Sequence, residues 1–440
     1  MNQTIPFLCT RNNAPLILND SEYSCPCGKR YPVLKGIPRF VPTESYASSF
    51  GLQWKKFAKT QLDSFTGTNL SRNRLIGLAG GSLDIFRGKN VLEAGCGAGR
   101  FTEIMLAAGA NVYATDISTA VEANYLNCKH FPNYTVLQAD IMALPFAPEQ
   151  FDVVFCAGVI QHTADPEKTM SILCSHVKPG GVLMMDHYTF NYPTTPSRLA
   201  VRSVLLKMNK HLALVFCRLT VAFLWPLHRF FFAARTLRGV GRLRKTFLHL
   251  SPVVDYQGDH PQLGTRLLYQ WAVLDTHDTL TDYYKHKRTV PEIFKHLASC
   301  GMTDIDAVYA GNGVEAMARK PLPGEVPAPT RWDPQLRPAW PHESLRGPFR
   351  HLEGRAWLAT LQEYRNLADW NDNNYRSPLF LYEDGVGLGP GHWRHREIIQ
   401  EGNGRYCHWG DGIIFSTSDG SDPNTNGRSY AIRLRLRQEG

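Results

Sequence analysis

One stretch of the sequence restricts the possible folds more than any other, and it covers residues 89–118: KNVLEAGCGAGRFTEIMLAAGANVYATDIS. Its apolar start predicts a short buried strand, residues 101–108 have the apolar periodicity of a helix, and a second strand ends at Asp116. Gly95, Gly97 and Gly99 lie in the turn before the helix, where a ligand can reach the backbone because no Cβ is in the way. This order of elements predicts an α/β fold that binds a ligand at the turn.

Three later segments extend the same pattern. Asp140 follows a third strand in VLQAD, FDVVFCAGVIQH predicts a fourth strand that leads into the loop 158–162, and VKPGGVLMMDH predicts a fifth strand that ends at His187. In an open α/β sheet, ligands bind at the carboxyl ends of the strands, where these residues are expected to lie. We therefore expect a Rossmann-like, doubly wound sheet. A small ribbon-like domain precedes it, a helical insertion interrupts it and a small β-rich module follows it.

From residue 89 to residue 187 this series resembles the class I S-adenosylmethionine-dependent methyltransferases. The resemblance implies S-adenosyl-L-methionine as the cofactor. The glycine turn would hold its methionine end, the acid after the second strand its ribose and the acid after the third strand its adenine, with the loop after the fourth strand near the sulfonium. The matching residues of this chain are Glu93, Gly95, Cys96, Gly97, Gly99, Asp116, Ile117, Asp140, Ile141 and the loop from Gly158 to His162. A nicotinamide cofactor is disfavoured, because Arg100 and Phe101 follow G-x-G-x-G where such sites usually have G-x-G-x-x-G.

Methyl transfer to oxygen or nitrogen needs alignment of the reactants and, for some acceptors, a base. Two histidines follow predicted strands, His162 after the fourth and His187 after the fifth. A neutral imidazole can take a hydroxyl proton at physiological pH. We expect His187 to be the stronger candidate for the catalytic base and His162 the weaker, because the resemblance explains a QH loop by packing or cofactor contact. The alternative is that each histidine only holds a loop by a hydrogen bond.

Residues 1–45 resemble the small zinc-ribbon-like domain that activates methyltransferases as a separate protein and that is also fused to their N-termini. Cys9 and the segment YPVLKGIPRF carry this resemblance, and in the family two C-x-x-C pairs hold zinc. Here Asn12 stands in place of one cysteine, and Cys25 and Cys27 are one residue too close together. We expect a degenerate module without metal. If zinc is retained, Cys9, Cys25 and Cys27 are its ligands.

Residues 46–190 and 288–320 are expected to form the catalytic domain. In fused relatives the segment after the ribbon covers the cofactor, which makes Trp54 and Gln61 candidate cofactor contacts; the alternative is a helix stripe that faces the core. Residues 191–287 predict a helical insertion. Five of its polar residues either line the acceptor pocket or lie on the surface of a lid helix. They are Asp275, His277, Asp278, Tyr283 and Tyr284.

The insertion also carries the positive charge of the chain. The net charge is +9 at pH 7, and the window 198–250 contains eleven Lys or Arg and no Asp or Glu. Its most apolar part, LALVFCRLTVAFLWPLHRFFFAAR, contains Arg218 and Pro226, which disfavour a transmembrane span. On a helix its cationic and apolar side chains fall on different faces. We expect a lid helix that is buried against the catalytic domain or a dimer partner, with peripheral membrane contact as the alternative.

The C-terminal part is expected to be a separate small module. Residues 321–350 are rich in proline and predict a linker, and residues 351–440 predict a β-rich module in which 354–373 looks helical. Asp419, Asp422, Asn424 and Asn426 are explained by hairpin-turn chemistry, with a calcium or sugar site as the alternative. Five further side chains suit either a sugar-facing surface or the core of a small module. They are His392, Trp393, His395, His408 and Trp409.

Together these features predict an enzyme that O-methylates a small-molecule, glycan or glycolipid acceptor, and the tail resembles those of proteins of bacterial surface-polysaccharide assembly. A tRNA or rRNA methyltransferase is the alternative enzyme, but the cations lie among Phe and Leu, so we expect no nucleic-acid partner. A regulatory or scaffold subunit is the non-enzymatic alternative, against which the intact glycine turn and both acids argue. Scattered cysteines and a start without signal-peptide features predict a cytoplasmic location, with peripheral contact at the inner membrane face through 198–250.

Overall fold

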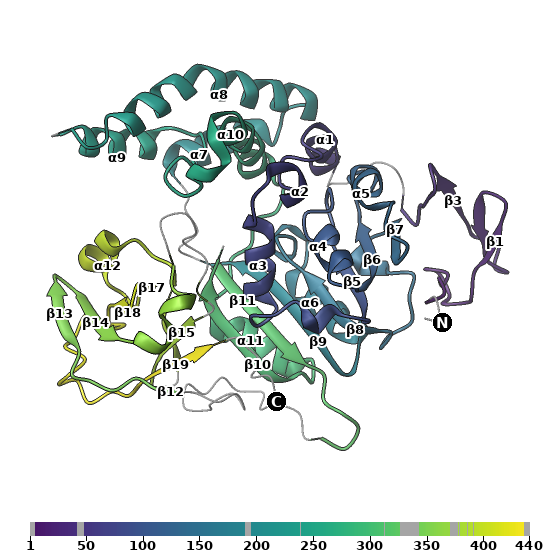
Figure 1. Cartoon of the computed structure of the whole chain (residues 1–440). Coiled ribbons are helices and arrows are strands. Elements are labelled where there is room, and N and C mark those ends of the chain that lie inside the picture. Colours follow the sequence, from purple (N-terminus) through teal and green to yellow (C-terminus); the bar gives the residue numbers. More distant parts are fainter. Residues whose placement is uncertain are drawn as a thin grey trace.

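The structure, a computed structural model, describes residues 5–41, 48–189, 195–237, 239–311, 313–325, 343–369, 377, 379–384, 386–389 and 391–434. Its centre is a seven-stranded sheet with the strand order β10-β11-β9-β8-β5-β6-β7 (Figure 1). The strands are β5 (Asn90–Ala94), β6 (Asn111–Asp116), β7 (Tyr134–Gln138), β8 (Phe151–Cys156), β9 (Val177–Tyr188), β10 (Thr303–Ala310) and β11 (Gly313–Arg319). Neighbours among β5 to β9 are parallel, and β11 runs antiparallel to both β9 and β10.

The order of the strands reverses at β5. Strands β6 and β7 extend the sheet on one side of β5, and β8 and β9 extend it on the other. In such a sheet the loops after β5 and β8 separate at the switch point and leave a crevice at the carboxyl ends of the strands. The predicted Rossmann-like, doubly wound fold is therefore confirmed, and the glycine turn lies at the switch point.

Helices cover both faces of the sheet, as parallel strands require. Adjacent residues of β5 point to opposite faces, so Val91 belongs to one hydrophobic core and Leu92 to the other. The core around Leu92 packs against α6 (Pro166–His176) and α11 (Val290–Ser299). The core around Val91 packs against α3 (Leu70–Leu78), α4 (Thr102–Ala107) and α5 (Val121–Cys128).

The N-terminal module is a four-stranded sheet of β1 (Ile17–Asn19), β2 (Glu22–Ser24), β3 (Arg30–Leu34) and β4 (Ile37–Pro38). Its Tyr31 and Phe40 are buried in the same hydrophobic core as Leu137 of β7. Arg39 donates to Gln138 Oε1 over 2.9 Å and forms an ion pair with Glu122 at 3.2 Å. The module therefore packs on the β7 edge of the central sheet.

Six helices form a layer beyond the carboxyl edge of the sheet (Figure 1). They are α1 (Ser48–Lys56), α2 (Asp63–Thr66), α7 (Pro196–Leu205), α8 (Lys210–Ala233), α9 (Val240–Leu250) and α10 (Gly264–Thr281). Helix α8 continues through Pro226, and α8 packs against α10. Among the described residues, α8 alone has the length and composition of a bilayer-spanning helix; 33% of its most apolar window is buried inside the protein.

The C-terminal module contains two four-stranded sheets, which confirms its β-rich character. Its elements are β12 (Glu343–Ser344), β13 (Arg350–Glu353), β14 (Ala356–Thr360), β15 (Leu379–Glu383), β16 (Val386–Gly387), α12 (His395–Glu401), β17 (Tyr406–Trp409), β18 (Gly412–Phe415) and β19 (Tyr430–Leu434). The module packs on the central sheet, because Val308 and Ala310 of β10 share a buried cluster with Phe380 and Tyr382 of β15.

The helix predicted over 354–373 is wrong for the residues that the structure describes. Residues 356–360 form β14, which is paired with β13 on one side and with β18 on the other, and a short 3-10 helix follows at Gln362–Leu367. Pairing with the adjacent β13 and with the distant β18 overrides the local helical preference of this segment. Residues 370–373 lie outside the described part of the chain.

The cluster of acidic and amide side chains near residue 420 stabilises a turn. Asp419 Oδ1 accepts hydrogen bonds from the backbone and hydroxyl of Ser421, and Asp422 Oδ1 accepts one from the backbone of Asn424 over 2.8 Å. The side-chain amide of Asn426 donates to the Tyr430 hydroxyl over 2.9 Å. These bonds are the turn chemistry that the sequence favoured.

A buried ion pair joins the C-terminal module to the sheet, and it provides a test of that packing. Arg433 of β19 contacts Asp306 of β10, with 2% and 1% of their side chains exposed. Asp306→Asn leaves the guanidinium buried without its counter-charge, so we expect the free energy of unfolding to fall by about 3–5 kcal/mol. Urea unfolding at pH 7 measures this. Asp84→Asn removes the exposed partner of Arg87 and should change stability by less than about 1 kcal/mol; equal losses would contradict the interpretation.

Candidate active site

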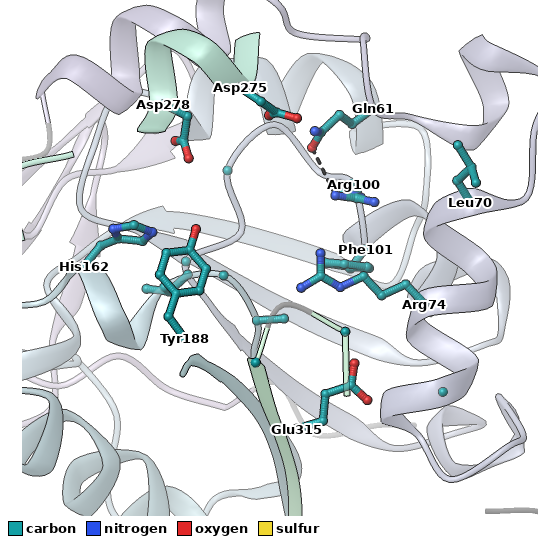
Figure 2. Close-up of a pocket in the computed structure, with 18 of the residues that line it drawn as sticks. Gln61, Leu70, Arg74, Arg100, Phe101, His162, Tyr188, Asp275, Asp278 and Glu315 are labelled. Carbon is teal, nitrogen blue, oxygen red and sulfur yellow. Dashed lines mark hydrogen bonds between the residues drawn. The ribbon is translucent and has the colours of Figure 1, made fainter. Parts of the chain in front are cut away.

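A pocket of about 750 Å³ opens at the carboxyl edge of the sheet. Its walls come from the glycine turn after β5, the loops after β6, β7 and β8, the helices α1, α3 and α10, and the C-terminal module. Figure 2 shows how the labelled side chains of these elements converge on the same space. A pocket of this size holds a small-molecule ligand of several hundred daltons.

The glycine turn forms one wall of the pocket. Backbone N–H groups of Gly95 and Cys96 both donate to the Thr115 carbonyl, over 2.7 and 2.8 Å, which holds the turn against the end of β6. Gly95 has φ of 82°, and a Cβ on it would lie 2.2 Å from Val159 Cγ2. Gly97 has φ of 50°, and a Cβ there would face the Trp54 indole at 3.4 Å. The turn therefore requires glycine at 95 for close packing and presents open backbone at 97.

Two acids after neighbouring strands lie beside this turn, as the sequence predicted. Asp116 Oδ2 accepts a hydrogen bond from the Gly97 backbone over 3.0 Å, and its Oδ1 accepts two from Ser118 over 2.8 and 2.7 Å. Burial raises the pKa of the Asp116 carboxyl, against the lowering effect of these hydrogen bonds. Asp140 Oδ1 accepts from the Met142 backbone over 2.9 Å. Both acids line the pocket together with Ile117 and Ile141, so the predicted ribose and adenine positions share one wall.

Two of the predicted cofactor residues do not line the pocket. Glu93 is 2% exposed, and its carboxylate accepts a hydrogen bond from the Thr102 hydroxyl at the start of α4. Burial raises the pKa of Glu93 to about 8. A Cβ on Gly99 would lie 3.2 Å from Cys128 Sγ of α5. In the structure these two residues attach the turn to its helices, while Gly95, Cys96 and Gly97 face the pocket.

The structure separates the two histidines. His162 lines the pocket, and its Nδ1–H donates to the Tyr284 carbonyl over 3.0 Å, with Asp282 Oδ2 at 3.5 Å. This bond fixes the tautomer in which Nε2 is the acceptor nitrogen. His187 is fully buried, its Nδ1 bonds to the Tyr188 carbonyl over 2.8 Å, and burial lowers its pKa to about 4.

His187 is absent from the described pocket wall because of strand alternation. Successive side chains of β9 point to opposite faces of the sheet, so Tyr188 reaches the pocket and His187 does not. The sequence predicted where the strand ends but not to which face of the sheet the His187 side chain points. Of the two predicted histidines only His162 lines the pocket, so the preference for His187 as the candidate base is corrected in favour of His162.

The predicted covering segment and part of the predicted acceptor set line the pocket. Trp54 and Gln61 both face it, and Gln61 Oε1 accepts from Arg100 over 3.2 Å. Asp275 and Asp278 of α10 also line it. Burial and the neighbouring Asp278 raise the pKa of Asp275 to about 7.

The other three members of that set lie elsewhere. His277 is buried, bonds to Gln53 Oε1 over 2.6 Å and has its pKa lowered by burial to about 4. Tyr283 is 60% exposed, and the Tyr284 ring stacks on His286. Tyr284 still takes part in the site, because its carbonyl holds His162.

Several further residues line the pocket that the sequence did not assign to the cofactor or acceptor site. Arg74 of α3 forms an ion pair with the buried Asp186, and Arg100 follows the glycine turn, where burial lowers its pKa to about 10. Glu315 of β11 faces them from the other side of the pocket (Figure 2). The loop and helix around α12 contribute His392 and neighbouring residues Trp393, Arg394 and Glu397. Only His392 and Trp393 had a signal in the sequence, as candidate sugar-facing side chains.

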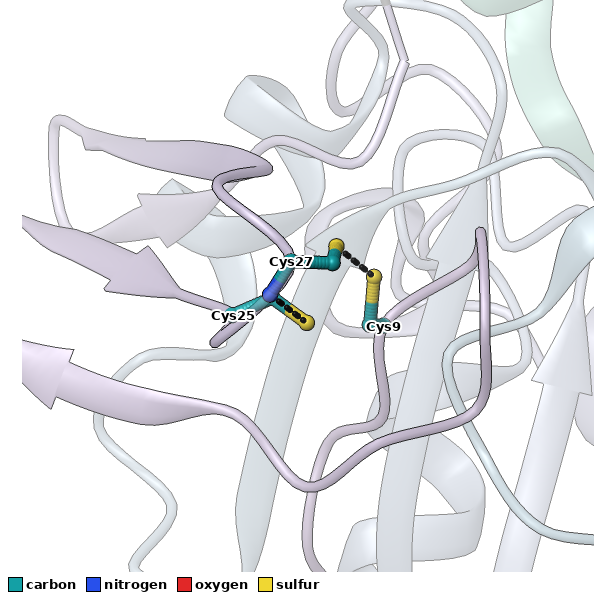
Figure 3. Close-up of side chains that lie close together, drawn as sticks. All are labelled: Cys9, Cys25 and Cys27. Atoms are coloured by element: carbon teal, nitrogen blue, oxygen red, sulfur yellow. Dashed lines mark hydrogen bonds between the residues drawn. The ribbon is translucent and has the colours of Figure 1, made fainter.

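The three cysteines of the N-terminal module converge in space (Figure 3). Their sulfur atoms all lie within 4.8 Å of one another, with Cys9 Sγ 3.7 Å from Cys27 Sγ. Asn12 Oδ1 lies 3.5 Å from Cys25 Sγ, beside the place of the missing fourth cysteine. Although burial raises it, hydrogen bonds from Tyr31 and the local backbone lower the pKa of Cys9 to about 7. Three thiols this close supply three of the four ligands of tetrahedral zinc, and the expectation of a metal-free module stays a prediction.

Comparisons with known proteins identify the domain around the pocket. Residues 92–185 match the profile of the methyltransferase domain family. The chain is 37% identical over 98 residues to the ubiquinone biosynthesis O-methyltransferase of Stutzerimonas stutzeri, which covers 21% of this chain and 42% of that protein. It is 32% identical over 155 residues to the tRNA U34 carboxymethyltransferase of Campylobacter curvus, which covers 32% and 49%. The chain thus spans less than half the length of these curated relatives.

Among solved structures, the human N-acetylserotonin methyltransferase in complex with S-adenosylmethionine matches with a TM-score of 0.35 and 16% identity. The match covers 64% of this chain and 60% of that one. The family profile and the curated relatives agree with the strand order and with the glycine turn at the switch point. Residues 92–185 therefore belong to the methyltransferase domain family, and the strand order with the glycine turn at the switch point is that of the class I S-adenosylmethionine-dependent methyltransferases.

Proposed function

We propose that the protein methylates a hydroxyl group of a glycan, a glycolipid or a related hydroxylated small molecule, in reactions such as those of surface-polysaccharide assembly. The observation that carries this proposal is the composition of the pocket. The same cavity contains the glycine turn with its two acids, the histidine His162 and a wall of charged side chains and aromatic rings. The first part suits the cofactor, and the rest suits an acceptor rich in hydroxyl groups.

The cofactor end uses residues that the structure places on one wall. Open backbone at Gly97 gives a ligand access, Asp116 presents a carboxylate for the ribose diol, and Ile141 presents an apolar side chain beside the adenine position. When bound, the cofactor supplies an electrophilic methyl group on a sulfonium. Trp54, which faces Gly97, would cover this end and exclude water.

The acceptor end is charged but not basic. Among the described residues, the pocket is lined by four arginines and eight carboxylates. A surface that binds the phosphates of RNA needs an excess of cations, so this balance argues against a nucleic-acid acceptor. Hydroxyl groups both donate and accept hydrogen bonds, and they match a wall that offers Arg100 as donor and Asp275 as acceptor. Aromatic rings such as Trp271 provide flat apolar surface for the C–H faces of a sugar.

His162 is the proposed catalytic base. Its Nδ1–H is donated to the Tyr284 carbonyl, so Nε2 would be the nitrogen that takes the proton of the acceptor hydroxyl. The resulting imidazolium would be stabilised by Asp282, whose carboxylate lies 3.5 Å from Nδ1. Asp282 is itself 1% exposed and held by Arg202 over 2.9 Å, so its position is fixed by α7.

Binding of the cofactor can be tested at Asp116. Asp116→Ala removes the carboxylate offered to the ribose, so we expect the Kd for S-adenosylhomocysteine to rise about 10- to 100-fold. Isothermal titration calorimetry measures this. Ser118→Ala removes one hydrogen bond to the same carboxylate but leaves the carboxylate in place, and it should raise Kd by less than about tenfold. An unchanged Kd in Asp116→Ala would contradict the assignment.

The base can be tested by a pair of matched variants. In His162→Asn the amide can still donate to the Tyr284 carbonyl but cannot accept a proton, so kcat should fall about 10²- to 10⁴-fold with the Kd for S-adenosylhomocysteine unchanged. His187→Asn makes the same replacement in the core and should keep kcat, provided that thermal melting shows a folded protein. The opposite pattern, with turnover lost in His187→Asn alone, would return the base role to His187.

The acceptor class can be tested by transfer of a radiolabelled methyl group from S-adenosylmethionine. We expect label in lipid-linked glycan or in hydroxylated metabolite fractions of a cell extract, because the pocket wall has no excess of cations. Label that is lost on ribonuclease treatment would overturn the glycan proposal and favour an RNA acceptor. The His162→Asn variant serves as the blank for each fraction.

A further inference from the structure

The outer face of α8 is apolar and uncovered. Seven side chains on one face of the helix form a stripe in which each is 40% to 79% exposed, with Phe223 the most exposed. They are Leu212, Val215, Phe216, Leu219, Phe223, Leu227 and Phe230. The opposite face, which includes Cys217 and Val221, is buried against the rest of the protein. Figure 1 shows α8 at the outer edge of the helical layer, with no element beyond it. A soluble protein rarely exposes an apolar stripe of this length without a use for it.

A second cavity lies beside this face, between α8, α10 and the α1–α2 segment. We call it the basic groove, and its volume is about 850 Å³. Five cations line it, and no acidic residue does among the residues that the structure describes. The cations are Lys56, Lys59, Arg218, Arg229 and Arg266. Its apolar floor comes from Phe57, Phe65, Trp225, Tyr269 and Val273.

The apolar stripe and the basic groove are parts of one surface. Arg218 and Arg229 are eleven residues apart on α8, so at 100° per residue they point within about 20° of each other. Phe223 points about 120–140° away from them, which puts the cations along one flank of the apolar stripe. Helix α9 extends the surface, since it has no buried residue and exposes Leu243 and Leu250. Apolar side chains flanked by cations match the boundary between lipid tails and anionic headgroups.

We propose that this surface docks the protein on a membrane that contains anionic phospholipids. The α8 stripe lies in the plane of the interface, and the basic groove takes a lipid phosphate with part of an acyl chain on its apolar floor. Charge complementarity selects this occupant, because every titratable side chain of the window 198–250 is a cation or a histidine apart from Cys217. A second copy of the chain is a poor occupant, because two-fold pairing would bring two copies of the same cations together.

The helix lies along the bilayer and does not cross it. Its inner face packs on α10, and 33% of its apolar window is already buried inside the protein. His228 on that inner face bonds to Asp255 Oδ2 over 3.0 Å, and Asp255 lines the large pocket. Docking through α8 would therefore set a wall of that pocket close to the membrane. Any role of this short distance in the access of a lipid-linked acceptor to the pocket rests on the proposed function, whereas the docking itself does not.

Vesicle sedimentation of the full chain tests the docking without any methyl transfer. We expect the protein to pellet with phosphatidylcholine vesicles that contain phosphatidylglycerol, to stay in solution with phosphatidylcholine alone, and to be released as salt is raised. Arg218→Ala combined with Arg229→Ala should weaken binding about 30-fold. Arg30→Ala combined with Arg87→Ala is the matched control; these exposed residues lie on other elements, so the loss of the same charge should leave binding unchanged.

A third variant tests the apolar contact. Leu219→Ser combined with Phe223→Ser should weaken binding to the anionic vesicles, and thermal melting should be unchanged because both side chains are exposed. Equal amounts of wild-type protein in the pellet with and without vesicles would overturn the proposal. The proposal would also be overturned if the wild-type protein formed a stable dimer that Leu219→Ser with Phe223→Ser dissociates, while no vesicle binding was seen. Binding of inorganic phosphate alone, measured by calorimetry, would overturn it as well. Vesicle binding with no methyl transfer to any fraction would support the docking and count against the proposed function only.

Discussion

The contact between Gly95 and Val159 is the constraint on which the site depends. The loop after β8 approaches the turn after β5 so closely that a single methyl group at position 95 would collide with the valine. Because β5 and β8 are neighbours at the switch point, this approach brings the cofactor wall and the loop with His162 into one cavity. The acids after β6 and β7 reach the same cavity without any further contact, because parallel strands end at the same edge of the sheet.

The molecule separates its charges between two surfaces. The pocket contains both carboxylates and arginines, whereas the basic groove and α8 contain cations without acids among the described residues. This separation explains why a net charge of +9 says little about the substrate: the charge belongs to a surface outside the site. Helix α8 links the two surfaces, because His228 on its buried face bonds to Asp255 of the pocket wall.

The fold and the cofactor wall could be predicted because they depend on local signals. The glycine turn, the strand ends and the acids that follow them can each be recognised from a short stretch of sequence. The structure places Asp116 and Asp140 at the pocket as expected. His187 could not be assigned in the same way, because a shift of one residue along β9 changes the face of the sheet. The helix expected near residue 360 failed because this segment pairs with β13 just before it and with β18, which lies more than fifty residues away. Arg74 gave no signal at all, since only tertiary packing brings α3 beside Asp186.

The acceptor end is assembled from parts that the central domain alone does not contain. Arg74 comes from α3, Asp275 from α10 and His392 from the C-terminal module, and each is held by contacts outside the matched domain 92–185. The buried pair of Arg433 and Asp306 fixes the last of these parts against β10. The curated relatives match only 21% and 32% of this chain, so their acceptors cannot be transferred to it. Under the proposed function, α3, α10 and the C-terminal module would select the acceptor together, because all three line the same cavity and a variant in any one of them would alter it.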